Sequence, residues 1–353
     1  MNTKRLDIEF MRILAAFFVI YNHTGMRGFY LFSTFRVTGV IYTLGLFLSI
    51  FCKFAVPLFL AIAGALLLGR EEAVAVVWRR RVLRIALILV VWSFLYHIYY
   101  LRPESIRDID LLAFFKGMLQ NATPFTFWYL YSYIGFLITL PFLRKFAQSL
   151  SRREYIYLFV IHFIFFSAVP VLEYVSGKTL YTFAKIAWLD CNIFIYPLLG
   201  YFLSTLPEGF WNWKRLALLW AANLLLLCLS TKLAIHDILM TGELTQTFHN
   251  TFVLINCATV FVTCQFIFHK LPPHFPTWLA RGIRSLGGAT LGIYLMHVFF
   301  LSSNAADALW NWLYERNVFP YLSSFILCAA VFLLGYIVTI IIKRIPILRR
   351  IVE

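Results

Sequence analysis

Two ionisable residues, Arg12 and His23, lie within the first long apolar stretch of this 353-residue chain. They are eleven positions apart. That is almost three turns of an α-helix, so both would share one helix face, about 16 Å apart along the axis. Charged groups are costly at membrane depth and usually serve a function there. Because an imidazole exchanges protons near neutral pH, the pair predicts a functional face with a fixed cation at one level and a proton acceptor at another.

Three further ionisable residues in apolar stretches are candidates for the same site, namely Lys53, Asp190 and His297. Asp190 could pair with Lys53 or orient the imidazole of His23, because a hydrogen-bonded carboxylate fixes a histidine tautomer. Lys53 could equally extend its ammonium to the outer interface. His297 is either a catalytic residue or a partner in helix packing, and the sequence leaves both interpretations open.

A cluster of arginines, Arg79, Arg80, Arg81 and Arg84, lies between the second and third long apolar stretches. Arginine pairs with phosphate oxygens through parallel N–H groups. Together with Arg12, the cluster therefore suggests a site for a cytoplasmic anion that carries several phosphates. Anchoring at the cytoplasmic face is the alternative, since Lys and Arg gather in the cytoplasmic loops of membrane proteins in general.

Membrane-spanning helices are the elements that must hold these residues. The chain is 61% hydrophobic, and apolar runs of roughly 18 or more residues, the length that a bilayer core requires, recur along it. Only helices satisfy their own backbone polar groups within one segment in lipid. We therefore expect an all-α polytopic membrane protein that forms one domain over residues 1–353. About ten transmembrane helices are expected, near residues 8–28, 40–69, 82–101, 124–143, 155–174, 184–205, 214–233, 250–269, 287–303 and 320–342.

Two local features are also expected, a break in the long second span around Pro57 and a short interfacial helix over residues 105–119. Of the 31 Lys and Arg residues, 20 fall on the side that holds both termini and 9 on the other. This asymmetry predicts that both termini are cytoplasmic. It also explains the net charge of +15 without nucleic acid as a partner. None of the six cysteines forms a CxxC pair, so no metal site is expected.

Five motifs in order along the chain resemble those of the acyltransferase-3 family of bacterial integral membrane O-acyltransferases, in the short form that acts on surface polysaccharide. Phe127 stands where the family frequently has Leu. The matches run from residue 5 to residue 297, nearly the whole chain. The motifs are Arg5-Leu6-Asp7 with Arg12, Ala15-Ala16 and His23, then Val56-Pro57-Leu58-Phe59 with Gly64, Arg79-Arg80-Arg81 with Arg84, Phe127-Trp128-Tyr129-Leu130, and Gly292-Ile293-Tyr294-Leu295-Met296-His297.

The resemblance implies a multi-pass enzyme of the bacterial cytoplasmic membrane that takes an acyl group, usually acetyl, from cytoplasmic acyl-CoA. The acceptor would be a hydroxyl of a surface polysaccharide or lipid-linked glycan outside. His23 would act as the general base, although a covalent acyl-histidine intermediate is an open alternative, as is succinyl in place of acetyl. The other expected roles are acetyl-CoA binding by Arg12, Arg79, Arg80, Arg81 and Arg84, orientation of His23 by Asp190 or His297, and contact with the sugar or thioester by Lys53 and Trp128.

A transporter or exporter of a small polar or acyl-linked substrate is the competing class. Intramembrane Arg, Lys, Asp and His residues also mark transport pathways. An inverted repeat would favour a transporter, and none is evident in the sequence.

Overall fold

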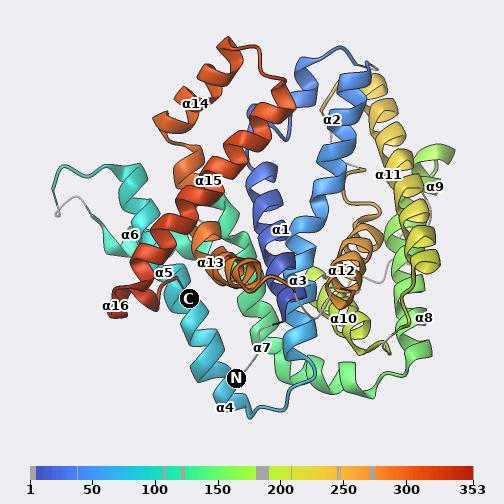
Figure 1. Ribbon diagram of the computed structural model, residues 1–353, viewed down its shortest axis with the longest axis horizontal. Coiled ribbons are helices and arrows are strands. Elements are labelled where there is room, and N and C mark those ends of the chain that lie inside the picture. Colours follow the sequence, from blue (N-terminus) through green and yellow to red (C-terminus); the bar gives the residue numbers. More distant parts are fainter. Residues whose placement is uncertain are drawn as a thin grey trace.

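The computed structural model describes residues 5–37, 39–105, 109–120, 124–179, 191–207, 209–244, 246, 248–270 and 275–352. Asp190, one of the predicted site residues, lies outside these ranges. The described residues form helices and connecting turns, with no β-strand among them (Figure 1). The helices are α1 (Leu6–Asn22), α2 (Val40–Phe51), α3 (Ala55–Leu67), α4 (Val74–Val77), α5 (Leu83–Leu101), α6 (Leu111–Gln120), α7 (Trp128–Ser149), α8 (Arg152–Phe163), α9 (Val169–Ser176), α10 (Asn192–Thr205), α11 (Trp213–Thr241), α12 (Val253–His269), α13 (Thr277–Leu301), α14 (Asn304–Glu315), α15 (Pro320–Lys343) and α16 (Pro346–Arg349).

Seven helical runs among the described residues are long and apolar enough to cross a membrane. The chain is therefore an all-α polytopic membrane protein, as the sequence predicts. The other three predicted spans correspond to shorter helices, α1 with 17 residues, α10 with 14 and α12 with 17. The count of ten spans and the cytoplasmic position of both termini stay predictions. The seven runs are Val40–Leu67, Val74–Leu101, Phe125–Ser149, Arg152–Ser176, Trp213–Thr241, Thr277–Leu301 and Pro320–Lys343.

The long second span is interrupted where the sequence predicts a break. α2 ends at Phe51, a 3₁₀ turn covers Cys52–Phe54, and α3 begins at Ala55. Pro57 lies in the first turn of α3, where its missing N–H cannot bond back to Lys53 and continue an α-helix through the turn. The predicted interfacial helix is also present, as α6, although it begins six residues later than expected.

α1 runs through the middle of the bundle and packs against α3, α12, α13 and α15 (Figure 1). Its apolar positions Met11, Ala15, Val19 and Ile20 are buried. Small residues let neighbouring helices approach, as membrane helix pairs commonly require. A Cβ at Gly64 of α3 would meet the carbonyl oxygen of Pro197 in α10 at 1.9 Å. The glycine of the second-helix motif is thus required by a close backbone crossing.

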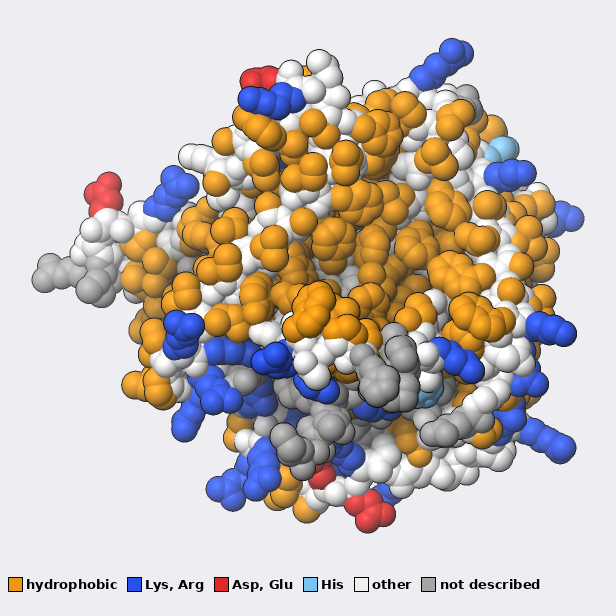
Figure 2. All heavy atoms as spheres, in the orientation of Figure 1, with side chains coloured by type: hydrophobic (Ala, Val, Ile, Leu, Met, Phe, Trp, Pro, Cys, Tyr) orange, Lys and Arg blue, Asp and Glu red, His pale blue; other side chains and the backbone are white. Residues whose placement is uncertain are grey.

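The basic segment before α5, residues 70–82, is called the arginine loop here. It lies on the same side of the bundle as the link from α7 to α8, and α14 lies on the other side (Figure 1). Figure 2 shows apolar side chains over the middle of this face, with Lys and Arg around its rim and most densely toward the lower edge. This distribution suits a protein whose apolar belt faces lipid and whose basic residues reach the interface. We call the side with the arginine loop the inner side.

Candidate active site

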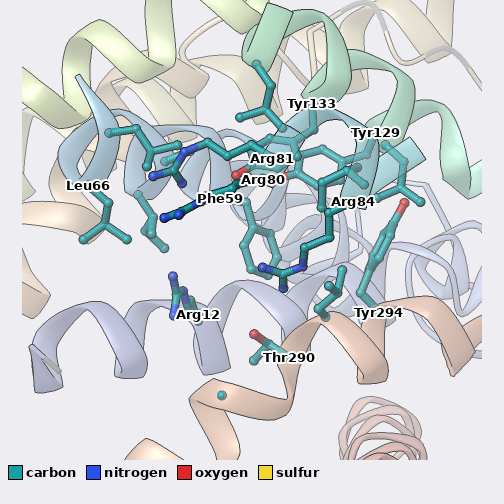
Figure 3. A pocket seen from close by; sticks show the side chains of 18 of the residues that line it. Arg12, Phe59, Leu66, Arg80, Arg81, Arg84, Tyr129, Tyr133, Thr290 and Tyr294 are labelled. Atoms are coloured by element: carbon teal, nitrogen blue, oxygen red, sulfur yellow. The ribbon is translucent and has the colours of Figure 1, made fainter. Parts of the chain in front are cut away.

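An arginine-rich cavity of about 710 Å³ opens on the inner side of the bundle and is called the inner cavity here. Figure 3 shows Arg12 on one wall and Arg80, Arg81 and Arg84 on the facing wall. Apolar side chains line the cavity together with these charged groups. The cavity therefore combines cationic groups with an apolar lining that includes Phe59, Ile62, Leu66, Ile85 and Leu137.

The arginine loop owes its conformation to Glu72. Both carboxylate oxygens of Glu72 accept from Arg81, at 3.0 and 2.6 Å. Arg144 also donates to Glu72 at 2.7 Å and to the carbonyl of Leu67 at 2.9 Å. The hydrogen bond from Arg81, with that from Arg144, lowers the pKa of Glu72 to about 2. Arg81 is thus already neutralised by a protein carboxylate at neutral pH.

The side chains of three arginines of the inner cavity, Arg70, Arg80 and Arg84, make no hydrogen bond or ion pair with any part of the chain that the structure describes. Arg79 does not line this cavity, although the sequence groups it with Arg80 and Arg81. It lines a separate groove beside α16 instead. Arg79, Arg80 and Arg81 lie in a five-residue π-helical turn, Trp78–Val82, and they line two different cavities.

Arg12 is held at the wall of the inner cavity by Glu9, whose carboxylate accepts from its guanidinium at 2.9 Å. Glu9 is only 3% exposed. It fits there because residue 287 of α13 is glycine, and a Cβ at that position would lie 2.4 Å from Oε2 of Glu9. Glu9 is therefore a buried partner of Arg12 between α1 and α13.

A second cavity, of about 870 Å³, opens on the opposite side and is called the outer cavity. His23, Lys53 and Trp128, three of the predicted site residues, all line it. Nζ of Lys53 donates to Oε1 of Gln246 at 2.9 Å and lies 4.6 Å from the ring centroid of Phe29. Other polar lining residues are Asn22, Tyr30, His162, Asn192, Asn250 and Thr251.

His23 caps the C-terminus of α1 and contacts His297 of α13. Nδ1 of His23 lies 3.1 Å from Nε2 of His297, and Nδ1 of His297 bonds to the carbonyl oxygen of Tyr294. A carbonyl only accepts, so Nδ1 of His297 carries the proton and its Nε2 is the acceptor in the neutral ring. His23 must then donate from Nδ1. Its Nε2 keeps a lone pair, which is what a general base needs.

Tyr129 and Tyr294 line both cavities and separate them. Their rings pack edge to face, with centroids 5.7 Å apart. The hydroxyl of Tyr294 donates to the carbonyl of Thr126 at 2.7 Å. Tyr129 stacks on Tyr133, which lines the inner cavity. The two aromatic rings therefore lie between the cavity that holds the arginines and the cavity that holds His23.

A family model described as an acyltransferase domain matches residues 5–347 of the chain. The chain belongs to the acyltransferase-3 family. Among the curated proteins and the solved structures, none matches it. Every residue that lines either cavity falls within the matched range, except Val352 of the inner cavity. The protein is thus a membrane acyltransferase.

Sequence reasoning missed several residues of this acyltransferase-3 site. Tyr129 and Tyr294 lie inside two of the family motifs, so the sequence does point to them. Only Trp128 and His297 of those motifs were predicted to be site residues. Glu72 precedes the arginine cluster by seven residues, and no spacing rule links it to Arg81. His162, which lines the outer cavity, lies within the predicted span 155–174 and was not predicted as a site residue.

Proposed function

We propose that this acyltransferase moves an acyl group, most simply acetyl, from acyl-CoA on the inner side to a hydroxyl of a surface glycan on the outer side. One observation carries the proposal: the cavity with Arg12 and the cavity with His23 meet at Tyr129 and Tyr294. A donor and an acceptor that enter from opposite sides would reach each other there, and neither would have to cross the whole protein.

The inner cavity has the chemistry that an acyl-CoA requires. Coenzyme A carries a diphosphate and a 3′-phosphate on a nucleoside, followed by a long thin pantetheine arm. Arg70, Arg80 and Arg84 supply guanidinium groups without carboxylate partners in the described residues, and such groups bind phosphate oxygens in pairs. The apolar wall of Phe59 and Ile85 would cover the arm. The residues present therefore fit this donor.

The outer cavity has the chemistry that a glycan requires. Amide side chains of Asn22, Asn192 and Gln246 offer both donors and acceptors to sugar hydroxyls. The indole of Trp128, at the cavity wall, offers a flat apolar face. A few placed polar groups within an otherwise apolar pocket are the usual means of fixing a ligand's orientation. Lys53 adds a cation on the same wall.

His23 would act as general base at the junction of the two cavities. Its Nε2 accepts the proton of the glycan hydroxyl while that oxygen attacks the thioester carbonyl, so an O–acyl bond forms and the S–acyl bond breaks. The same nitrogen then returns the proton to the leaving thiolate, and His23 ends unchanged. Help of this kind is worth about 10²–10⁴-fold in rate. A direct transfer needs no acyl-enzyme intermediate, and His297 serves throughout to hold the required tautomer.

The test is transfer by purified protein in liposomes. Radiolabelled acetyl-CoA is supplied on one side, and surface polysaccharide from which alkali has removed the esters is supplied on the other. We expect label in base-labile esters of the polysaccharide, with one free CoA thiol released per ester. Thiol release without esters would make the protein a thioesterase. Label that crosses the bilayer unattached to glycan would make it a transporter, and either result would refute the proposal.

A further inference from the structure

A second arginine-rich groove, of about 620 Å³, lies between the start of α5 and the C-terminal segment of the chain. We propose that this basic groove binds the phosphate headgroup of an anionic phospholipid from the inner leaflet of the membrane. The proposal concerns a site apart from the acyl-transfer path and does not depend on the proposed reaction. The groove is lined by Arg79, Leu83, Arg84, Leu87, Pro346, Arg349 and Arg350.

The polar lining of the groove is basic. Four of its lining residues are arginines, and no Asp or Glu is among the lining residues in the described chain. Arg79 and Arg84 also form no ion pair in the described parts. Basic pockets between helices at the cytoplasmic face are recognised sites for anionic lipid headgroups. A phosphate is thus the group that this cluster would accept.

The apolar part of the groove favours a lipid over a soluble phosphate. Arg79, Leu83 and Leu87 follow at four-residue intervals and so share one face of the helical run Val74–Leu101. The side chains of Leu83 and Leu87 are 56% and 51% exposed. Because this run is a membrane-spanning helix, exposed leucines on it face acyl chains. A headgroup at Arg79 would place its fatty acyl chains over these two leucines.

The opposite wall of the groove is fixed in place. Nε1 of Trp92, on α5, donates to the carbonyl oxygen of Ile351 at 2.8 Å. Val352 is fully buried and contributes to the inner cavity. These two contacts hold Arg349 and Arg350 beside α5, so the groove is formed before any ligand arrives. Preorganisation of this kind reduces the entropy that binding must overcome.

Arg84 lines both the basic groove and the inner cavity. A phosphate in the groove and a phosphate in the cavity would therefore lie on two sides of one guanidinium. A test of the lipid site must separate these two sources of phosphate. It must also distinguish a specific lipid site from general attraction between a basic surface and an anionic bilayer.

The experiment measures lipid binding by native mass spectrometry of the full-length protein in detergent. Phosphatidylglycerol is titrated against wild type and against the double variant Arg349→Gln/Arg350→Gln, with phosphatidylcholine as the neutral lipid. Since a basic residue near an anionic headgroup contributes about fivefold in affinity, the variant should bind phosphatidylglycerol about 25-fold more weakly. Arg79→Gln, which leaves the C-terminal segment intact, should weaken phosphatidylglycerol binding about fivefold. It replaces the double variant in the test if that variant does not fold.

The matched control is Arg153→Gln/Arg281→Gln, which removes two exposed arginines that line none of the three cavities. It should bind phosphatidylglycerol like wild type. Unchanged lipid binding in both groove variants would overturn the proposal. So would an equal loss in the control, because the attraction would then be general. Displacement of the lipid by millimolar inorganic phosphate would also overturn it, since the groove would then be a soluble-phosphate site.

Discussion

Nδ1 of His23, at the end of α1, lies 3.1 Å from Nε2 of His297 in α13. The carbonyl oxygen of Tyr294 accepts a hydrogen bond from Nδ1 of His297. Nε2 of His297 is then the acceptor for Nδ1 of His23, and Nε2 of His23 keeps its lone pair. A histidine, rather than a carboxylate, thus fixes the tautomer of the candidate base among the described residues. His297 is 1% exposed, which shields this contact from water.

Replacement of His23 by Ala should lower acyl transfer about 10²–10⁴-fold, because it removes the nitrogen that accepts the hydroxyl proton. Binding of acetyl-CoA, measured by calorimetry, should stay near the wild-type value, since the arginines of the inner cavity are untouched. His269→Ala, at an exposed histidine that lines neither cavity, is the matched control. Near-normal transfer by His23→Ala would eliminate His23 as the base.

Substitutions at His297 should show whether this residue orients the imidazole of His23 or only fills space between helices. His297→Leu removes the acceptor for Nδ1 of His23 and should lower kcat about tenfold or more, with the KM for acetyl-CoA unchanged. His297→Gln offers an amide oxygen as a replacement acceptor and should recover part of the lost kcat. Steady-state kinetics of both variants provide the measurement. Equal activity of the Leu and Gln variants would mean that His297 acts only in helix packing.

Much of this arrangement could be predicted from spacing along single helices. The eleven-residue interval predicts that Arg12 and His23 share a face of α1, and they line the inner and outer cavities respectively. The break before Pro57 follows from a missing amide proton. Such features depend on residues a few turns apart, for which helix geometry is sufficient. The catalytic and binding roles of these residues stay predictions.

Contacts between distant segments could not be predicted in the same way. The pairing of His23 with His297 joins residues 274 positions apart, and the burial of Glu9 depends on a glycine in α13. Arg79 lines a different groove from Arg80 and Arg81, and all three lie in the π-helical turn Trp78–Val82. A regular helix read from the sequence contains no sign of that turn. Asp190 lies outside the described residues, so its predicted role is untested.

Arg80→Gln and Arg84→Gln should each raise the KM for acetyl-CoA about tenfold or more, with a smaller effect on kcat. Each loses a charge-assisted contact to phosphate, of the kind worth about 1.5–3 kcal/mol. The comparison variant is Arg153→Gln, an exposed inner-side arginine outside both cavities. Dephospho-CoA as a competitor would show whether the lost contact is to the 3′-phosphate. An unchanged KM in both cavity variants would remove the arginines from donor binding.

The ion pairs of Glu72 should make the stability of the protein depend on pH. Its pKa is lowered from 4.5 to about 2 by hydrogen bonds from Arg81 and Arg144. The stabilisation from a lowered pKa is complete above about pH 4.5 and is lost as the pH falls toward 2. Glu72→Gln should therefore lower stability at pH 7, by about 1 kcal/mol for a partly exposed network. The difference in Tm between wild type and Glu72→Gln should narrow from pH 5 to pH 3, and a constant difference would contradict this origin.

The ring of Tyr129 is expected to keep the two cavities apart. Its ring lines both of them and packs against Tyr294, so Tyr129→Ala should open a water path from the inner to the outer cavity. Water would then compete with the glycan hydroxyl for the thioester. We expect acceptor-independent release of CoA thiol to rise several-fold while ester formation falls, both followed in one assay with a thiol reagent and radiolabelled acetyl-CoA. Tyr157→Ala, at a tyrosine that is 67% exposed on α8 and remote from both linings, should leave this partition unchanged. If Tyr129→Ala kept the wild-type ratio of ester to released thiol, the two rings would not form the barrier between donor and acceptor.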